Sequence, residues 1–189
     1  NVLGAGKLPA GAKIVQAEVV GPSLGAESVN AGMYSFIIAF VIIILYMLFY
    51  YGGAGIYAVI AITFNLFYLM GIMDSVDATL TLPGIAGIVL SMAMSIDANV
   101  IVYERTKEEL FAGKNIREAY NEGFNFSLSA IIDGNITSLL TAVVLYIFGT
   151  GPIQGFAVTL GIGIILSMFT CVLLTRVLIF SRLEKGKNL

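Results

Sequence analysis

Two aspartates in apolar surroundings are the residues of this sequence with the clearest capacity for chemistry. Asp97 lies inside the stretch "GIVLSMAMSIDANVIVYERTKEE", residues 87–109, and Asp133 lies inside a second apolar run. A charged Asp near the centre of a bilayer costs about 2.5 to 3.5 kcal/mol on insertion scales, so it persists where it has a partner or a task. Burial raises a carboxylate pKa and a nearby cation lowers it. A carboxyl group that alternates between such environments can therefore carry protons across a membrane.

The residues alone leave two interpretations of Asp97 open. In the first, it is a proton carrier; in the second, it stays protonated, bonds to Asn135 or a backbone carbonyl, and holds helices together. The structural interpretation is favoured for Asp133, whose helix contains glycine. The sequence has no His, so proton chemistry must use carboxylates, and its single Cys171 lies in an apolar run, which excludes disulfides and thiolate metal sites. We expect no metal, no cofactor and no enzymatic activity.

The composition is that of a membrane protein. Hydrophobic residues make up 58% of the chain and charged residues only 12%. A membrane-spanning helix needs about 20 apolar residues. Three runs without any Asp, Glu, Lys or Arg have about this length or more: 28–73, 78–96 and 134–175.

Glycine and proline divide the two longest runs. The breaks are "YYGGAG" at 50–55 and "GTGP" at 149–152. The sequence therefore predicts an all-α polytopic membrane protein with a transmembrane domain over 28–183 and five spans, at about 30–50, 54–73, 82–103, 126–148 and 153–180.

The positive charges predict the orientation of these spans, because short cytoplasmic loops are enriched in Lys and Arg. The loop at 74–83 has two acids and no cation. All eight cations after Lys13 fall on the other side of the five-span arrangement: Arg105, Lys107, Lys114, Arg117, Arg176, Arg182, Lys185 and Lys187. That side, with the tail 184–189, should be cytoplasmic, and the N-terminus should lie outside.

Residues 1–27 are expected to be the end of an extramembrane domain. The segment "KIVQAEVV" at 13–20 alternates apolar and polar residues, which is typical of a strand. One strand buries too little to fold alone, and the chain has neither an initiator Met nor a signal peptide, so we expect a fragment of a longer protein. The alternative interpretation is a disordered tail.

Small residues at every fourth position predict which helices pack closely, since helices in lipid associate through close backbone approach. We expect spans three, four and five to form a tight core and spans one and two to lie at its periphery. The packing positions are Gly87, Ser91 and Ser95 on span three, Ala130, Gly134, Ser138 and Ala142 on span four, and Gly151, Gly155, Thr159, Gly163, Ser167, Cys171 and Thr175 on span five.

Five polar residues are expected near one depth in the membrane. Asp97 lies about 7 Å and Asp133 about 6 Å from the midpoints of their spans, toward the cytoplasm, at 1.5 Å rise per residue. Asn99 and Asn135 each follow an aspartate by two residues, and Thr170 of the last span is near this level. The cations lie at span ends or beyond, so a counter-charge for Asp97 should come from another polypeptide or from a part of the protein outside this sequence.

The polar stretch at 104–125 is a solvated connection with no catalytic or nucleic-acid-binding signal. Gly113 interrupts it, and Asn115 with Glu118 is typical of a helix N-cap and its partner. We expect a short surface helix here, whose Tyr120 and Phe124 lie against the membrane.

Three segments together resemble the C-terminal portion of SecD, within the SecD/SecF family of protein-export membrane proteins. The Asp-Ala-Asn triplet at 97–99, followed by Glu-Arg at 104–105 and Glu-Glu at 108–109, is SecD-like, whereas SecF typically has Asp-Arg at the end of the corresponding helix. Gly134 departs from the Ala expected there, which should alter packing rather than chemistry. The segments are "LPAGAKIVQAEVVGPSLG" at 8–25, "GIVLSMAMSIDANVIVYERTKEEL" at 87–110 and "IIDGNITSLLTAVVLYIFGTGPIQGFAVTLGIGIILSMFT" at 131–170.

The resemblance implies helices two to six of a six-helix half of the RND superfamily, with residues 1–27 ending a periplasmic domain. It also implies a bacterial inner-membrane location and a SecF-like half as partner, fused or separate. By this resemblance the protein assists the SecYEG channel in drawing a translocating polypeptide across the membrane with the proton-motive force, and Asp97 corresponds to the family's intramembrane aspartate. Membrane lipids are further partners, and nucleic acid is not one.

Two other functions share these features. An RND exporter of small molecules or lipids has the same helices and carboxylate, and differs in its substrate-binding periplasmic domain. A membrane scaffold without ion flux would use both aspartates only to hold helices together.

Overall fold

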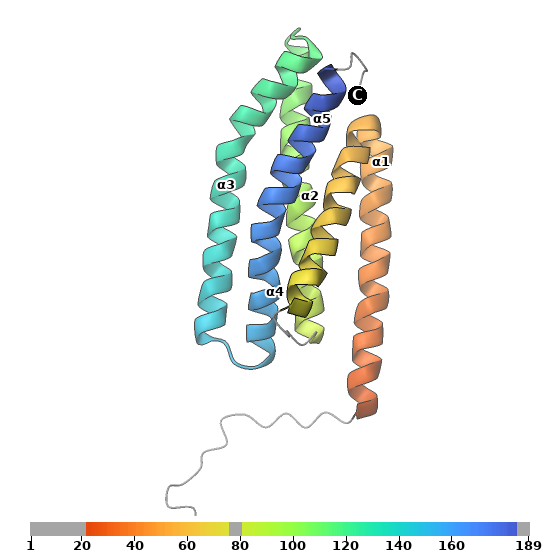
Figure 1. Ribbon diagram of the computed structural model, residues 1–189, viewed down its shortest axis with the longest axis vertical. Coiled ribbons are helices and arrows are strands. Elements are labelled where there is room, and N and C mark those ends of the chain that lie inside the picture. Colours follow the sequence, from red (N-terminus) through yellow and green to blue (C-terminus); the bar gives the residue numbers. More distant parts are fainter. Residues whose placement is uncertain (1–21, 76–80, 185–189) are drawn as a thin grey trace, which may run out of the picture.

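The computed structural model describes residues 22–75 and 81–184, and all regular elements in these two ranges are helices. They are α1 (Pro22–Ser75), α2 (Leu82–Phe111), α3 (Ile116–Phe148), α4 (Pro152–Ser167), the π-helix η1 (Met168–Leu174) and α5 (Thr175–Glu184). The helices form an elongated bundle along one axis (Figure 1). Within the described ranges, four segments are long and apolar enough to cross a membrane: Glu27–Ser75, Leu82–Phe111, Ile116–Phe148 and Pro152–Leu183. The predicted all-α membrane architecture is confirmed.

Helix α1 is two helical arms joined at Gly52. This residue has φ 52° and ψ −121°, a conformation outside the helical region that glycine adopts without a side-chain clash. Phe36 of the first arm and Leu66 of the second line the same apolar pocket, so the arms fold back on each other, as the orange and yellow segments show (Figure 1). The predicted break at 50–55 lies at this reversal. The count of five spans stays a prediction that depends on treating the two arms separately.

The predicted N-terminal strand is not seen in the described part of the chain. Residues 1–21, which include "KIVQAEVV", lie outside it. Residues 22–27 belong to helix α1. Pro22 suits the first position of a helix, because its fixed φ is helical and its missing N–H is not needed there.

Helices α2 and α3 continue beyond the apolar segments that predict them. Gly113, with φ 92°, separates them, and the Asn115 side chain caps α3 by accepting from the Glu118 N–H at 3.0 Å. The predicted short surface helix is wrong, because α3 runs without a break from Ile116 to Phe148. Tyr120 and Phe124 are only 1% and 3% exposed, so they pack in the bundle rather than on the membrane surface.

The predicted last span corresponds to α4, η1 and α5 in continuous succession. Gly151 precedes α4 with φ 46°, at the predicted "GTGP" break. The seven residues of η1 are wound as a π-helix, which the sequence analysis did not predict. Such segments are rare and occur often at functional sites.

The closest packing joins α2 to α4. A Cβ atom at Gly87 would overlap Thr159 Oγ1 and lie 3.0 Å from the Phe156 carbonyl oxygen, and a Cβ at Gly163 would overlap the Ser91 side chain. Helix α3 approaches α2 through a glycine that the predicted stripe did not include, because a Cβ at Gly123 would lie 2.8 Å from the Thr106 backbone nitrogen.

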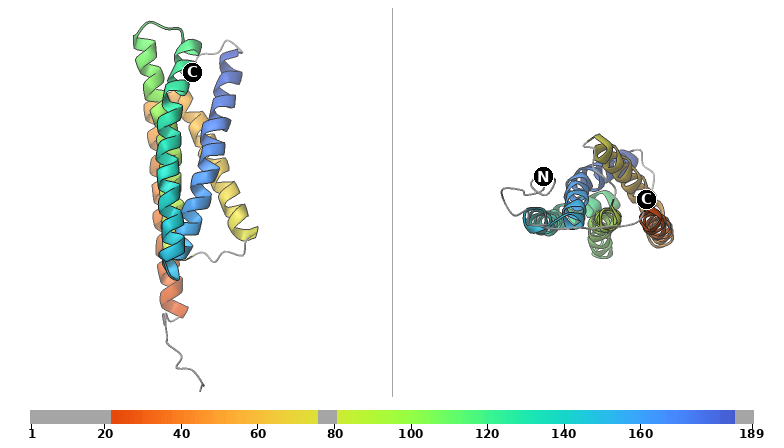
Figure 2. Two further views of the ribbon diagram at one scale, coloured as in Figure 1. Left: turned by 90° about the vertical axis from the view of Figure 1, so that its left-hand side faces the viewer. Right: turned by 90° about the horizontal axis from the view of Figure 1, so that it is seen from below.

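The helices form two layers. Seen from below, the first arm of α1, α2 and α3 form one row, and α4 with the second arm of α1 lies on one side of it (Figure 2). The other side of this row, called the open face below, has no helix of the described chain over it (Figure 2).

Two alanine substitutions in α4 should separate close packing from helix propensity. Gly163→Ala pushes a Cβ into Ser91 and should lower the free energy of unfolding by about 1 to 3 kcal/mol. Gly161→Ala is the matched control, because its Cβ would lie 3.8 Å from Ala142 Cβ, an ordinary contact, and should be neutral or stabilise by about 0.5 to 1 kcal/mol. Thermal unfolding of the purified protein in detergent measures both. Equal midpoints for the two variants would contradict the close packing.

Candidate proton-transfer site

Asp97 lies on the open face, in the middle helix of the row. It is exposed in the described chain and lines two pockets. One, of about 180 Å³, lies between α2 and α3 and also has Asn135 in its wall. The other, of about 420 Å³, lies between α2 and the first arm of α1 and has Tyr46 in its wall. The carboxylate therefore sits between two flanking helices.

The packing of α2 explains this direction. Ser91 and Ser95 are fully buried, which fixes one side of α2 toward the bundle. At 100° per residue, Asp97 is rotated by 240° from Ser91 and so points away from that side. Asn99, two residues further on, is 3% exposed and donates from Nδ2 to the Ser95 carbonyl oxygen at 3.3 Å. The structure thus separates Asp97 from Asn99.

Asp133 and Asn135 are separated in the same way. Asn135 is buried and donates to the Ile131 carbonyl oxygen at 2.7 Å, and its Oδ1 has no partner among the described residues. Asp133 is exposed and lines neither pocket of Asp97. Gly134 is also exposed, and a Cβ built on it would have no atom within 4 Å. Of the predicted polar set, the structure brings together only Asp97 and Asn135.

Thr170 belongs to a separate polar contact inside the bundle. The Asn65 side chain, fully buried in the second arm of α1, donates to Thr170 Oγ1 at 2.9 Å. The Thr170 hydroxyl donates to the Leu166 carbonyl oxygen at 2.8 Å, and Asn65 Oδ1 has no partner. Sequence analysis missed Asn65, although one amide residue in the apolar run "AITFNLFYL" at 61–69 was a usable signal.

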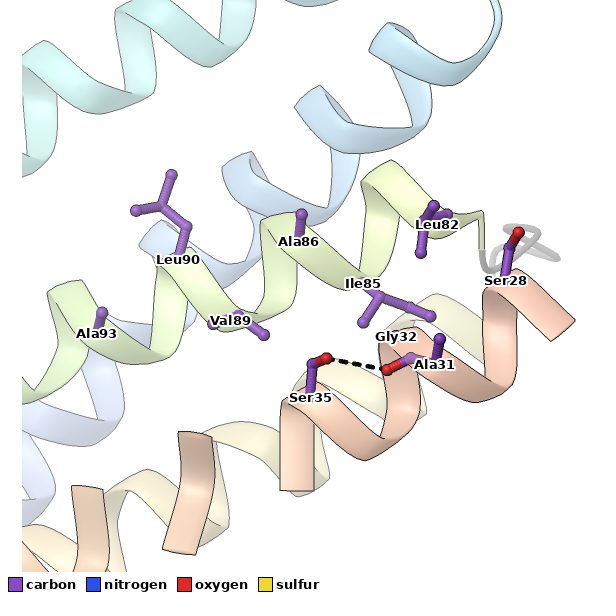
Figure 3. A pocket seen from close by; sticks show the side chains of 10 residues that line it. All are labelled: Ser28, Ala31, Gly32, Ser35, Leu82, Ile85, Ala86, Val89, Leu90 and Ala93. Atoms are coloured by element: carbon purple, nitrogen blue, oxygen red, sulfur yellow. Dashed lines mark hydrogen bonds between the residues drawn. The ribbon is translucent and has the colours of Figure 1, made fainter. Parts of the chain in front are cut away.

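A groove continues the open face from Asp97 toward the start of α2. Its volume is about 670 Å³, and Ala93 lines both this groove and the Tyr46 pocket. Figure 3 shows mainly small or aliphatic side chains along it, among them Gly32 and Ser35 of α1 and Ala86 of α2. Ser35 donates to the Ala31 carbonyl oxygen of its own helix at 3.0 Å, the dashed line in Figure 3.

Charged residues gather beyond Asp97, at the end of the bundle that contains the turn between α2 and α3. Glu104 accepts from Tyr51 Oη at 2.9 Å and from Lys107 Nζ at 2.8 Å. Lys114 pairs with Glu109 and Glu122, and these hydrogen bonds raise the pKa of Lys114 above its usual value. Charged groups are thus concentrated outside the apolar length of the helices.

The residues of 22–75 and 81–184 contain no cluster of three or more His, Cys, Asp or Glu that could hold a metal ion. The two pockets of Asp97 hold one carboxylate, Asp97 itself, with the amide of Asn135 and the phenol of Tyr46 nearby. This set can bind and release a proton.

Comparison with known proteins identifies the family. The model of the family described as protein export membrane protein SecD/SecF, C-terminal, matches residues 6–185. The chain belongs to the SecD/SecF family. It is 49% identical over its whole length to a protein translocase subunit SecD of Magnetococcus marinus, and 48% identical over 94% of its length to that of Rhodothermus marinus. It spans 36% and 29% of these relatives, about a third of their length.

Two solved structures share the fold. The crystal structure of SecDF from Thermus thermophilus matches with a TM-score of 0.84 and 41% identity, over 89% of this chain and 24% of that one. A SecDF structure in a super-membrane-facing form matches with a TM-score of 0.83 and 40% identity, over 100% and 26%. The similarity to the C-terminal portion of SecD, inferred from three sequence segments, is confirmed.

The contact between Asn65 and Thr170 is testable by a double-mutant cycle. Thr170→Val keeps the side-chain shape but leaves Asn65 Nδ2 without its acceptor, which should cost about 1 to 3 kcal/mol. With Asn65→Leu present, most of this loss should disappear. Thr63→Val is the control, because the Thr63 hydroxyl is exposed and donates to the Val59 carbonyl oxygen of its own helix. Chemical or thermal unfolding in detergent measures the four free energies, and additive losses would contradict the contact.

Proposed function

We propose that this chain is the membrane part of a proton-motive-force-coupled accessory subunit of Sec protein translocation, located in the bacterial inner membrane and without enzymatic activity. Membership of the SecD/SecF family supports the general role, since the relatives are named as subunits of a protein translocase. The observation that carries the coupling step is the position of Asp97, an exposed carboxylate between two flanking helices in pockets lined mostly by apolar side chains.

The open face is the surface on which the SecF-like half docks. A charged Asp directed at hydrocarbon costs about 2.5 to 3.5 kcal/mol, so a polar or cationic group of the partner is needed there. The neighbouring small residues Ala130 and Gly134 are exposed and line the Asp97 pocket, which allows close approach of a partner helix. The assembled pair acts on the SecYEG channel and its translocating polypeptide, in keeping with the description of a SecDF relative as translocon-associated.

Asp97 is the proton carrier in this proposal. In contact with water it releases its proton, and when a conformational change removes it from water or from its partner's charge it takes one up. Asp133 has a secondary place, because it is exposed but does not line the pockets of Asp97. Residues 1–27 end a periplasmic domain, and both arms of α1 cross the membrane.

The proposed orientation places the turn at 112–115 in the cytoplasm and the end of α1 outside. Ala112→Cys and Ser75→Cys, each in a protein whose Cys171 is replaced by Ala, should report it, because both positions are exposed ends of helices. An impermeant thiol reagent added to spheroplasts should label position 75 and spare position 112 until the membrane is opened. The opposite labelling would overturn the orientation.

Replacement of Asp97 tests the coupling. Asp97→Asn keeps the size and most hydrogen bonding but removes the titratable group, so the full-length complex should assemble while gradient-driven secretion and proton flux fail. Asp97→Glu keeps a carboxylate and should retain part of the activity. Asp133→Asn should cause the smaller loss.

Flux and secretion are measured in vesicles that contain the full-length protein with its SecF-like half, at equal amounts of assembled complex. A merely structural Asp97 predicts the reverse order, with Asn tolerated and the longer Glu disruptive. Normal flux in Asp97→Asn would exclude the proton-carrier role.

A further inference from the structure

The open face contains a second carboxylate in line with Asp97. Glu104 follows Asp97 by seven residues, which is close to two helical turns and about 10.5 Å along α2. Both side chains therefore lie on the same side of the helix. Glu104 is at the end of the bundle where the charged residues gather, and it is held by Tyr51 and Lys107.

A cluster of three tyrosines on the first arm of α1 lies next to both carboxylates. Tyr46 lines the pocket of Asp97. Its ring stacks on that of Tyr50 with centroids 5.6 Å apart and meets that of Tyr51 edge-on at 6.3 Å, and the rings of Tyr50 and Tyr51 are 4.8 Å apart. Tyr51 then donates to Glu104 Oε1 at 2.9 Å.

Apart from Tyr46, the described residues that line the two pockets with Asp97 carry no titratable side chain. Its pocket with Tyr46 is otherwise lined by Ala93, Met94, Ile96 and Val100. Among the described residues, Tyr46 is the one titratable side chain that α1 contributes there. In the pocket between α2 and α3, helix α3 contributes no titratable side chain. Its lining residues are Ala130, Ile131, Gly134, Asn135 and Ser138.

We propose that Tyr46, Tyr50 and Tyr51 form a hydroxyl relay between Asp97 and Glu104, through which protons pass between the membrane interior and the α2–α3 turn end of the bundle. This inference rests on the proposed proton-carrier role of Asp97. It assigns Tyr46 and Glu104 as proton-transfer residues.

The relay needs no oxidant or reductant. The O–H bond of protonated Asp97 breaks, each phenol or bridging water accepts one proton and gives up another, and an O–H bond forms on the Glu104 carboxylate. Glu104 then releases the proton to bulk water. Lys107, whose Nζ is 4.3 Å from the Tyr50 ring centroid and 4.6 Å from that of Tyr51, stabilises the Glu104 carboxylate between transfers.

The test is proton flux in vesicles containing the full-length protein and its SecF-like half. Tyr46→Phe keeps the ring stack and removes the hydroxyl, and Glu104→Gln keeps the size and removes the carboxylate. Each should lower flux about a hundredfold or more at equal amounts of assembled complex, the order expected for loss of one positioned proton-transfer group. Glu104→Asp should restore part of the flux, which a packing role would not predict.

Matched controls come from the same helices. Tyr68→Phe removes the hydroxyl of a tyrosine outside the cluster whose overall exposure is nearly equal, 48% against 49% for Tyr46. Glu108 lies about one helical turn beyond Glu104 and pairs with Arg105. Glu108→Gln removes this carboxylate. Both should retain the flux of the unmodified protein.

The dependence of flux on pH at the α2–α3 turn side gives a second readout. The titratable and charged groups that face the relay are Asp97, Tyr103, Glu104 and Lys107 of α2, Tyr120 of α3 and the three tyrosines of α1. Because Glu104 releases the proton to water on this side, flux should slow as the pH there falls and Glu104 stays protonated for longer, and Glu104→Gln should lose this part of the pH dependence. If Asp97→Asn abolishes flux while Tyr46→Phe and Glu104→Gln match their controls, the relay is wrong and the proton-carrier role stands. If Asp97→Asn leaves flux unchanged, both fail.

Discussion

The close contact between α2 and α4 determines where the chemistry of this protein is placed. At Gly87 and Gly163 the two helices approach so closely that a single methyl group would not fit. In lipid there is no hydrophobic driving force between helices, so this approach and its dispersion contacts hold the pair together. Because the contact fixes the rotation of α2, it directs Ser91 and Ser95 inward and Asp97 outward.

The same rotation divides the polar residues into two groups with different requirements. Inside the bundle, Asn99 and the Asn65–Thr170 pair obtain most of their hydrogen bonds from the chain itself, beside the π-helix η1. These groups add specificity to the packing and carry no charge. On the open face, Asp97 has an amide and a phenol in its pockets and no cation of the described chain in their walls. Its charge balance must therefore come from a partner or from protonation.

The sequence predicted the features that depend on local chemistry. The breaks fall at Gly52, Gly113 and Gly151, because the chain there takes a positive φ that glycine tolerates. The Asn115 cap was predictable because its side-chain oxygen can accept a hydrogen bond from the first turn of α3. The lengths of α2 and α3 were underestimated because hydropathy reports only the part of a helix that suits lipid, whereas tertiary packing extends both helices into the polar region. The π-helix has no such sequence signature.

The candidate site was predicted in part for a related reason. Spacing placed Asp97 and Asn135 at one depth, and they do share a pocket. It also grouped Asp133 and Asn99 with them, although residues two apart on a helix point to different sides. Asn65 was missed because an isolated amide gives no periodic signal, and only the fold shows that it is fully buried against Thr170.

Small residues illustrate what spacing leaves undetermined. The stripes of α2 and α4 face each other, whereas Gly134 of α3 faces the open side and Gly123 makes the contact with α2. A stripe of small residues permits close approach but does not say whether the neighbouring helix belongs to the same chain. The aspartate supplies that information. A carboxylate beside an exposed stripe is costly in lipid, so Asp97 and Gly134 together support the proposal that helices outside the described residues cover the open face.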